Sequence, residues 1–114
     1  MKRVGIFGWG VVAPKSPNIE SFEHNLDHAT SWLTPHAGFG PSNFLVGRPE
    51  FDFAVYKSWL DERFGTRRFS QLNEKMGNMA KYAMGAFIQA LGQNTGIESL
   101  LQKLETKAHI YVGT

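Results

Sequence analysis

The chain has 114 residues, of which 42% are hydrophobic and 19% charged, and this composition indicates a folded domain or part of one and excludes a disordered or collagen-like chain. Its 12 Lys and Arg residues against 10 Asp and Glu give a net charge of +2, so the overall charge does not indicate nucleic-acid binding. The absence of cysteine excludes disulfides, zinc–thiolate sites, iron–sulfur clusters and a cysteine nucleophile within these residues. No apolar run approaches the roughly 18 residues that cross a bilayer, and no signal-peptide pattern is present, so we expect a cytoplasmic protein without a membrane span.

The first predicted element is a strand over residues 3–13, in which β-forming residues lie on both sides of Gly8-Trp9-Gly10 and Pro14 ends the run. The same glycines open a match to the G-x-G-x-x-A pattern of dinucleotide-binding folds. That pattern works only where a helix N-terminus follows it, whereas the next two valines favour extended backbone, and no strand ending in an acidic residue follows about 20 residues later. We interpret the segment as a glycine-bent strand and keep a small nucleotide-binding βαβ module as an alternative.

A helix over residues 17–29 is expected next. Ser16-Pro17 has the pattern of an N-cap residue followed by proline at the first helical position. Ile19, Phe22 and Leu26 then recur at spacings of three and four, which predicts one apolar helix face.

The middle of the chain predicts a long ordered loop over residues 30–55 and a short helix over residues 56–63. The loop contains several prolines and glycines but few charges, and its aromatic residues are expected to pack against other elements.

A long helix over residues 69–91 is the strongest prediction, because apolar and small residues repeat there at helical spacing. Gly77 and Gly85 lie inside it, and each costs a helix roughly 1 kcal/mol relative to alanine. A helix that keeps both is expected to pack closely against another backbone.

The last predicted elements are a helix over residues 96–105 and a strand over residues 108–112. Thr95 and Glu98 match the capping-box pattern that opens a helix. The two strands with helices between them predict an α/β fold, but two parallel strands leave both sheet edges open and cannot cover these helices. We therefore expect an incomplete unit, either the N-terminal part of a longer protein or a chain whose sheet is completed by partners.

No catalytic, cofactor or metal site is predicted. His24 and His28 lie four residues apart and could face one metal ion, but they fall near the polar face beside Glu20, without an obvious third ligand, and we interpret them as a solvated pair. No serine has a nucleophile-elbow context, and the carboxylates are spread along helices like those of solvated faces.

A local basic cluster lies between residues 63 and 81. Five basic residues face one acidic residue, Glu74, giving a local charge of +4: Arg63, Arg67, Arg68, Lys75 and Lys81. Either a carboxylate elsewhere compensates the cluster or the cluster binds an acidic partner. Nucleic acid is the weaker partner hypothesis, because no stacking aromatics or known recognition motif accompany the basic residues.

Four stretches together resemble the β-ketoacyl-[acyl-carrier-protein] synthases of the thiolase-like superfamily. Residues 4–14, VGIFGWGVVAP, resemble the opening strand of that family, V-x-x-T-G-x-G-x-V-[ST]-P. Residues 19–26, IESFEHNL, and 75–91 are similar to its next helix and its long helix, and residues 110–114, IYVGT, resemble a strand that reads V-x-x-G-[ST]. Phe7 stands where threonine is frequent, which suggests a divergent branch.

The resemblance implies a layered α/β/α/β/α fold, of which these residues would form the N-terminal segment, in a homodimer or in a heterodimer of thiolase-fold subunits. In the family, a Cys and two His carry out decarboxylative Claisen condensation in fatty acid or polyketide synthesis, and all three would lie beyond residue 114, so this segment alone is expected to be an inactive part of an acyltransferase. The resemblance also implies docking of the acidic acyl carrier protein at Lys75, with Arg67 and Arg68 nearby. The alternative is a non-catalytic partner subunit similar to chain-length factors.

Overall fold

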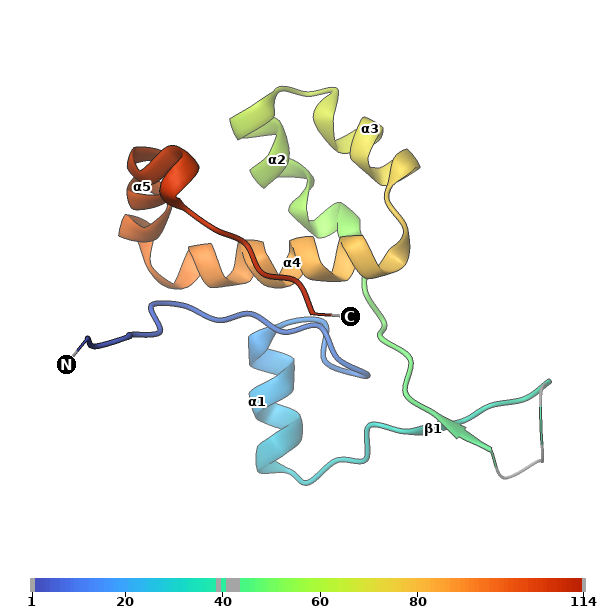
Figure 1. Ribbon diagram of the computed structural model, residues 1–114. Helices are drawn as coiled ribbons and strands as arrows, with labels where there is room; N and C mark the ends of the chain where they lie inside the picture. Colours follow the sequence, from blue (N-terminus) through green and yellow to red (C-terminus); the bar gives the residue numbers. More distant parts are fainter. Residues whose placement is uncertain (1, 39, 41–43, 114) are drawn as a thin grey trace.

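The computed structural model describes residues 2–38, 40 and 44–113, and Figure 1 shows their arrangement. The α-helices are α1 (Ile19–Asp27), α2 (Lys57–Phe64), α3 (Arg68–Lys75), α4 (Asn78–Gln93) and α5 (Thr95–Leu104), and two short 3₁₀ helices, η1 (Phe53–Tyr56) and η2 (Glu105–Lys107), precede α2 and follow α5. The sheet described consists of two short antiparallel strands, β1 (Thr34–Pro35) and β2 (Leu45–Val46), with Thr34 opposite Val46. The fold is thus mixed α/β but mostly helical, and its strands lie within the segment expected to be a loop.

The core lies between α4 and the elements η1 and α2. The buried hydrophobic side chains in the described part of the chain are Phe53, Leu60, Ile88 and Leu91. Phe51 also lies here, because Gly85 of α4 has no side chain and leaves room for the ring; a Cβ at Gly85 would lie 2.6 Å from the Phe51 ring. One of the two glycines expected in the long helix therefore serves close packing, against an aromatic ring rather than a backbone.

The single long helix expected over residues 69–91 is wrong, because α3 and α4 are separated at Met76 and Gly77. Both residues have extended backbone, with ψ angles of 130° and 165°, and Gly77 is the N-cap of α4 rather than an interior residue. The break lets α3 return against α2, where the Phe69 ring stacks on Phe53 at 5.5 Å between centroids (Figure 1). Two adjacent apolar helix faces at different angles gave the same periodicity as one long helix.

The helix expected over residues 17–29 is confirmed as α1, with a different cap. Asn18 is the N-cap, and its side chain accepts a hydrogen bond from the backbone N–H of Ser21 at 2.9 Å. Ser16, expected to be the cap, is instead fully buried in a turn that pairs with Ala13. The Asn25 side chain donates to Ser16 Oγ and to the backbone oxygen of Lys15, which holds α1 against this turn.

The strand expected over residues 3–13 is wrong in the described structure, because these residues have no neighbouring strand. Beyond the bridge to Ser16 at its end, the segment is extended and lies along the side of α4 away from α2 and α3 (Figure 1). Gly8 and Gly10 face the backbone carbonyls of Ala90 and Ala86, and a Cβ on either glycine would overlap those oxygens. The expected approach of α4 to another backbone is therefore made by this segment.

The strand expected over residues 108–112 is also wrong in the described structure, since these residues are irregular and no strand lies beside them. The helix expected over residues 96–105 is confirmed as α5, but without the capping box. Its N-cap is Asn94, whose side chain accepts from the N–H of Gly96 at 3.1 Å, while Glu98 contacts a different helix.

The chain is more open than a folded monomer of its size. It exposes 9165 Å², whereas about 6,300 Å² is expected at 12.8 kDa, an excess of about 2,900 Å². Its radius of gyration is 17.0 Å against about 13 Å for a compact domain of this length. The excess is as large as the surface buried in an obligate protein interface.

Candidate functional site

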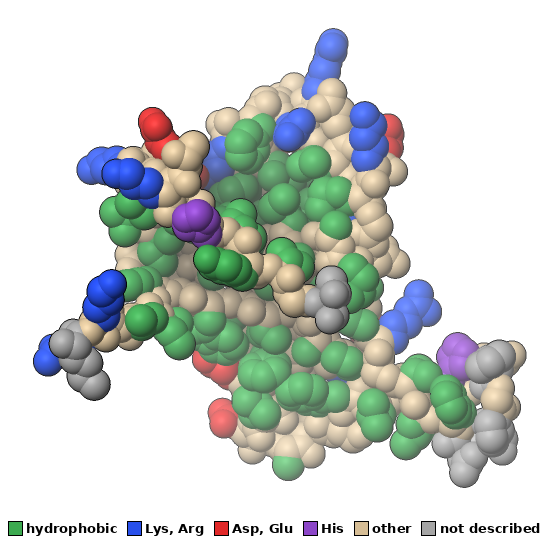
Figure 2. Space-filling view, in the orientation of Figure 1, with side chains coloured by type: hydrophobic (Ala, Val, Ile, Leu, Met, Phe, Trp, Pro, Cys, Tyr) green, Lys and Arg blue, Asp and Glu red, His purple; other side chains and the backbone are tan. Residues whose placement is uncertain are grey.

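A surface of exposed apolar side chains is the most extensive feature of the molecule. It comprises the end segments, with Val4, Ile6, Phe7, Ile110, Tyr111 and Val112, and neighbouring residues of α5. Ile6 is 89% exposed and Tyr111 is 91% exposed, far more than such side chains usually are in a folded domain. We call these residues the apolar face; Figure 2 shows hydrophobic side chains gathered over the middle of the molecule.

An apolar hollow of about 240 Å³ lies within this face. It is lined by Phe7 of the N-terminal segment, by Asn94 and Gly96 at the start of α5, and by Ile97, Leu100 and Leu101 of α5. Contiguous exposed apolar surface is typical of protein–protein interfaces, membrane-contact sites and ligand-binding grooves. The sequence indicated this feature only indirectly, through two strands that could not cover the helices between them.

A glutamine on α4 fixes the N-terminal segment beneath this face, and sequence reasoning missed it. Gln89 accepts a hydrogen bond from the Val11 N–H at 3.2 Å, and its side-chain nitrogen lies 3.1 Å from the Val11 oxygen, 3.2 Å from the Pro17 oxygen and 2.9 Å from the Tyr56 hydroxyl. Gln93, one helical turn later, accepts from the Trp9 N–H at 2.8 Å. The available signal was a polar residue in an otherwise apolar helical stretch, which indicates a buried polar contact but does not identify its partners.

The three residues expected to bind a carrier protein lie on α3 and are exposed. Arg67 and Arg68 are at its start and Lys75 is its last residue, so that about 10 Å of helix separates them. Within the part of the chain that the structure describes, none of the three forms an ion pair. The structure brings Arg67 and Arg68 together as neighbours and places Lys75 at the opposite end of the helix.

Arg63 does not belong to this basic surface, because it pairs with Glu98. Its guanidinium donates two hydrogen bonds to the Glu98 carboxylate, at 2.6 and 2.9 Å, and lies over the Trp59 ring, 4.1 Å from the ring centroid. The hydrogen bond from Arg63 lowers the pKa of Glu98, and the same bond raises the pKa of Arg63. The carboxylate that compensates part of the basic cluster is therefore on α5.

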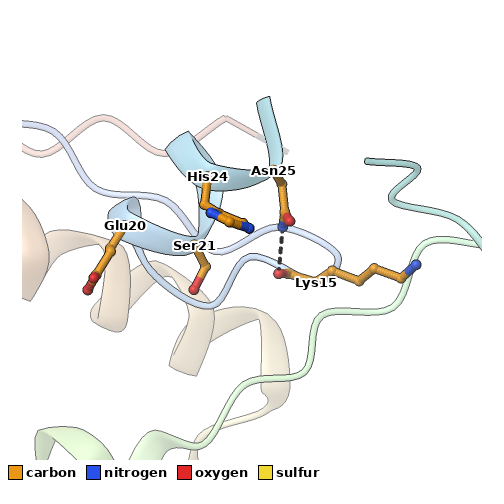
Figure 3. A pocket seen from close by; sticks show the side chains of 5 residues that line it. All are labelled: Lys15, Glu20, Ser21, His24 and Asn25. Atoms are coloured by element: carbon orange, nitrogen blue, oxygen red, sulfur yellow. Dashed lines mark hydrogen bonds between the residues drawn. The ribbon is translucent and has the colours of Figure 1, made fainter. Parts of the chain in front are cut away.

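A hollow lined by polar groups lies along α1 (Figure 3) and has a volume of about 340 Å³. It is lined by Lys15, Glu20, Ser21, His24 and Asn25. The His24 ring extends toward the Lys15 side, whereas Glu20 points away from it. The described residues contain no cluster of three or more His, Cys, Asp or Glu side chains able to hold a metal ion.

The glycine motif at residues 8–13 packs against α4. The glycines lie against the α4 backbone, and the next helix, α1, begins at Ile19 rather than directly after the motif. A dinucleotide site needs close approach of the phosphates to these glycines and to a helix N-terminus. The geometry gives no support to the nucleotide-binding alternative.

No protein-family model matches the sequence, and no curated protein or solved structure is significantly similar to it. In the part of the chain that is described, the helices are too short or too polar to cross a membrane.

Proposed function

We propose that the chain forms part of a β-ketoacyl-[acyl-carrier-protein] synthase-like protein of the thiolase-like superfamily, acting in the cytoplasm. The observation that carries the proposal is the apolar face. The two end segments that resemble family strands are apolar and β-forming, and residues 4–7 and 110–112 are exposed. The N-terminal segment lies against α4 and lines a hollow with α5, and the C-terminal segment follows α5 and η2 in the chain. Such segments become stable strands when further strands supply hydrogen-bond partners and cover their side chains.

The size of the excess exposed surface supports this proposal. About 2,900 Å² is more than the roughly 800 Å² that each partner buries in a standard-sized protein contact. A surface of this size exceeds a small binding patch and supports the proposal that a further layer covers the apolar face. In the proposed protein, further strands lie over the apolar face and convert residues 3–13 and 108–112 into neighbours in a layered α/β/α/β/α arrangement.

The chemistry of the proposed enzyme lies outside these residues. Condensation in the family requires a thiolate nucleophile and donors at the thioester oxygen, and the chain contains no cysteine. The segment is therefore expected to supply scaffold and to have no condensing activity alone. Turnover of malonyl and acyl thioesters by the purified 114-residue chain would contradict the proposal.

Binding of an acidic acyl carrier protein is the part of the proposal that α3 supports. Arg67, Arg68 and Lys75 are exposed and carry charge opposite to that of the carrier. Exposed charge pairs contribute about 0.2–1 kcal/mol, so Lys75→Glu is expected to weaken carrier binding by up to about fivefold, with a larger loss when Arg67 and Arg68 are also reversed.

The matched control is Lys103→Glu on α5, which changes the net charge equally at another surface. Titration calorimetry at low salt measures both variants, because salt screens such contacts. Equal losses in Lys75→Glu and Lys103→Glu would indicate unspecific charge attraction and would contradict docking at α3.

The coding sequence downstream of residue 114 distinguishes an enzyme from a non-catalytic partner subunit. A cysteine in a small-residue turn followed by two spaced histidines is expected for the synthase. A thiolase-type sequence lacking that cysteine would instead support the alternative, a partner similar to chain-length factors.

A further inference from the structure

The two histidines at the C-terminal end of α1 have their rings in contact. The His24 and His28 rings stack with their centroids 4.1 Å apart and their planes inclined by 27°. Both side chains are on the exposed surface, and His24 also lines the polar hollow along α1 (Figure 3). The two rings therefore occupy one position on the helix surface at the i, i+4 spacing that allows two imidazoles to share one metal ion.

A backbone hydrogen bond sets the tautomer of the second ring. His28 Nδ1 lies 2.8 Å from the backbone oxygen of His24, and because a carbonyl oxygen only accepts, Nδ1 carries the proton. The lone pair of a neutral His28 ring is then on Nε2. An imidazole that donates one N–H to a backbone carbonyl and presents the other nitrogen is the usual arrangement of a metal-ligating histidine.

The helix that carries the pair is held in place. The same His24 oxygen also accepts the backbone N–H of His28, which is the C-cap of α1. Asn25, between the two histidines, is bonded to Lys15 and Ser16 of the preceding turn. The two rings are consequently presented by an anchored helical turn, as a chelating site requires.

The local charge favours a cation. Glu20, Glu23 and Asp27 lie on α1, and the helix has neither lysine nor arginine. Lys15 lines the hollow beside His24, but its Nζ donates to the Ser31 backbone oxygen. The pair is also at the C-terminal end of the helix, where backbone carbonyls carry partial negative charge. Both the carboxylates and the backbone carbonyls attract a divalent ion bound there.

We propose that His24 and His28 form a two-imidazole site for a late first-row divalent metal ion, with solvent or an external ligand completing the coordination. Two metal–nitrogen bonds of about 2.1 Å place the ligating atoms about 3 Å apart, a distance that rings 4.1 Å apart reach by tilting. Nitrogen ligands select copper, nickel and zinc over magnesium and calcium, which take oxygen ligands. This site is independent of the proposed condensing function.

Titration of the tag-free 114-residue protein with Ni²⁺, followed by calorimetry, tests the site. One ion is expected to bind per chain, and Mg²⁺ is expected not to bind. Loss of an outer-shell partner alone weakens metal binding by about 10- to 100-fold, so His24→Gln or His28→Gln is expected to weaken Ni²⁺ binding by at least about tenfold.

Two kinds of control are used. One leaves His24 and His28 in place, and the other keeps the total number of histidines. His36→Gln and His109→Gln remove histidines elsewhere and are expected to leave the Ni²⁺ affinity unchanged. Leu26→His combined with His28→Gln keeps four histidines but moves the second ring to the other side of the helix, and is expected to bind as weakly as His28→Gln alone. Circular dichroism verifies that each variant is folded. Equal losses in all histidine variants, or unchanged affinity in His24→Gln and His28→Gln, would overturn the proposal.

Discussion

The two segments predicted to be strands have similar sequences but differ in how the molecule holds them. Residues 8–11 are bonded to α4 through Gln89 and Gln93. Residues 108–112 make only one backbone hydrogen bond within the described structure, from Ala108 to Glu105 in the turn that precedes them. Apolar, β-forming sequence is common to both, so it does not explain the difference.

The difference comes from polar groups and side-chain volume. Backbone N–H and C=O groups that leave water need partners, and a glutamine side chain supplies both a donor and an acceptor. Gly8 and Gly10 have no Cβ, which lets their backbone approach that of α4. The C-terminal segment has neither advantage, and its apolar side chains remain exposed.

The largest expected effect is that of Gly10→Ala, which places a methyl group against the Ala86 carbonyl. No rotamer change relieves a clash with backbone, so the segment must move, and the bonds of Trp9 and Val11 to α4 weaken with it. The free energy of unfolding is expected to fall by about 3 kcal/mol, the upper part of the range for overpacking. Urea denaturation measures this change.

Gly113→Ala, the matched substitution in the other end segment, meets no atom within 4 Å. Its effect is expected to be within about 0.5 kcal/mol. Equal destabilisation by the two substitutions would show that the N-terminal segment is no more firmly held than the C-terminal one.

The second effect is that of Gln89→Met, which keeps the side-chain length but removes the amide. It leaves the Val11 N–H and C=O without their protein partners in a half-buried position, at an expected cost of about 2 kcal/mol. Hydrogen exchange at Val11 is expected to accelerate. Gln102→Met, on the exposed surface of α5, is the control and should change neither quantity; slow exchange retained in Gln89→Met would contradict the role of Gln89.

The smallest effect is the pH dependence that Glu98 contributes through Arg63. Its pKa is lower in the folded than in the unfolded chain, so its stabilisation is complete above the unfolded-state pKa and is lost as the pH falls through the folded-state pKa. Because the pair is exposed, solvent screens it and the effect is small. Wild type and Glu98→Gln should differ in urea midpoint at neutral pH and converge in acid.

Glu74→Gln, an exposed carboxylate on α3, is the control for this titration and should follow the wild type throughout. A constant difference between wild type and Glu98→Gln across the acid range would show that Glu98 acts through packing rather than through its charge.

Local periodicity predicted the approximate positions of α1, α2 and α5. The residues expected to begin α1 and α5 were wrong, because Asn18 and Asn94 are their N-caps. The same patterns failed at Met76 and Gly77, since one hydrophobic period is compatible with both a continuous helix and two helices at an angle. The local patterns also failed for Glu98. It was expected to form a capping box with Thr95, but it pairs with the distant Arg63 instead.

The candidate surfaces were predicted to different degrees. The sequence predicted that two strands could not cover the apolar helices. Neither strand forms in the described structure, and the apolar side chains of both end segments are exposed. The sequence predicted an exposed basic cluster with a compensating carboxylate elsewhere as one alternative. For Arg63 that alternative is confirmed, since it pairs with Glu98, 35 residues away in the sequence. The histidine pair was noticed by its spacing, whereas the ring stacking and the bond to the His24 carbonyl required coordinates.

By itself, the sequence determined the approximate positions of α1, α2 and α5 and where the small residues of α4 lie. These properties depend on neighbours three or four residues apart and on composition. Only the tertiary structure decided that residues 8–11 are fixed by Gln89 and that residues 108–112 are not. The reason is that strands and buried polar contacts depend on partners distant in the chain, and a segment's own sequence does not specify whether such a partner is within reach.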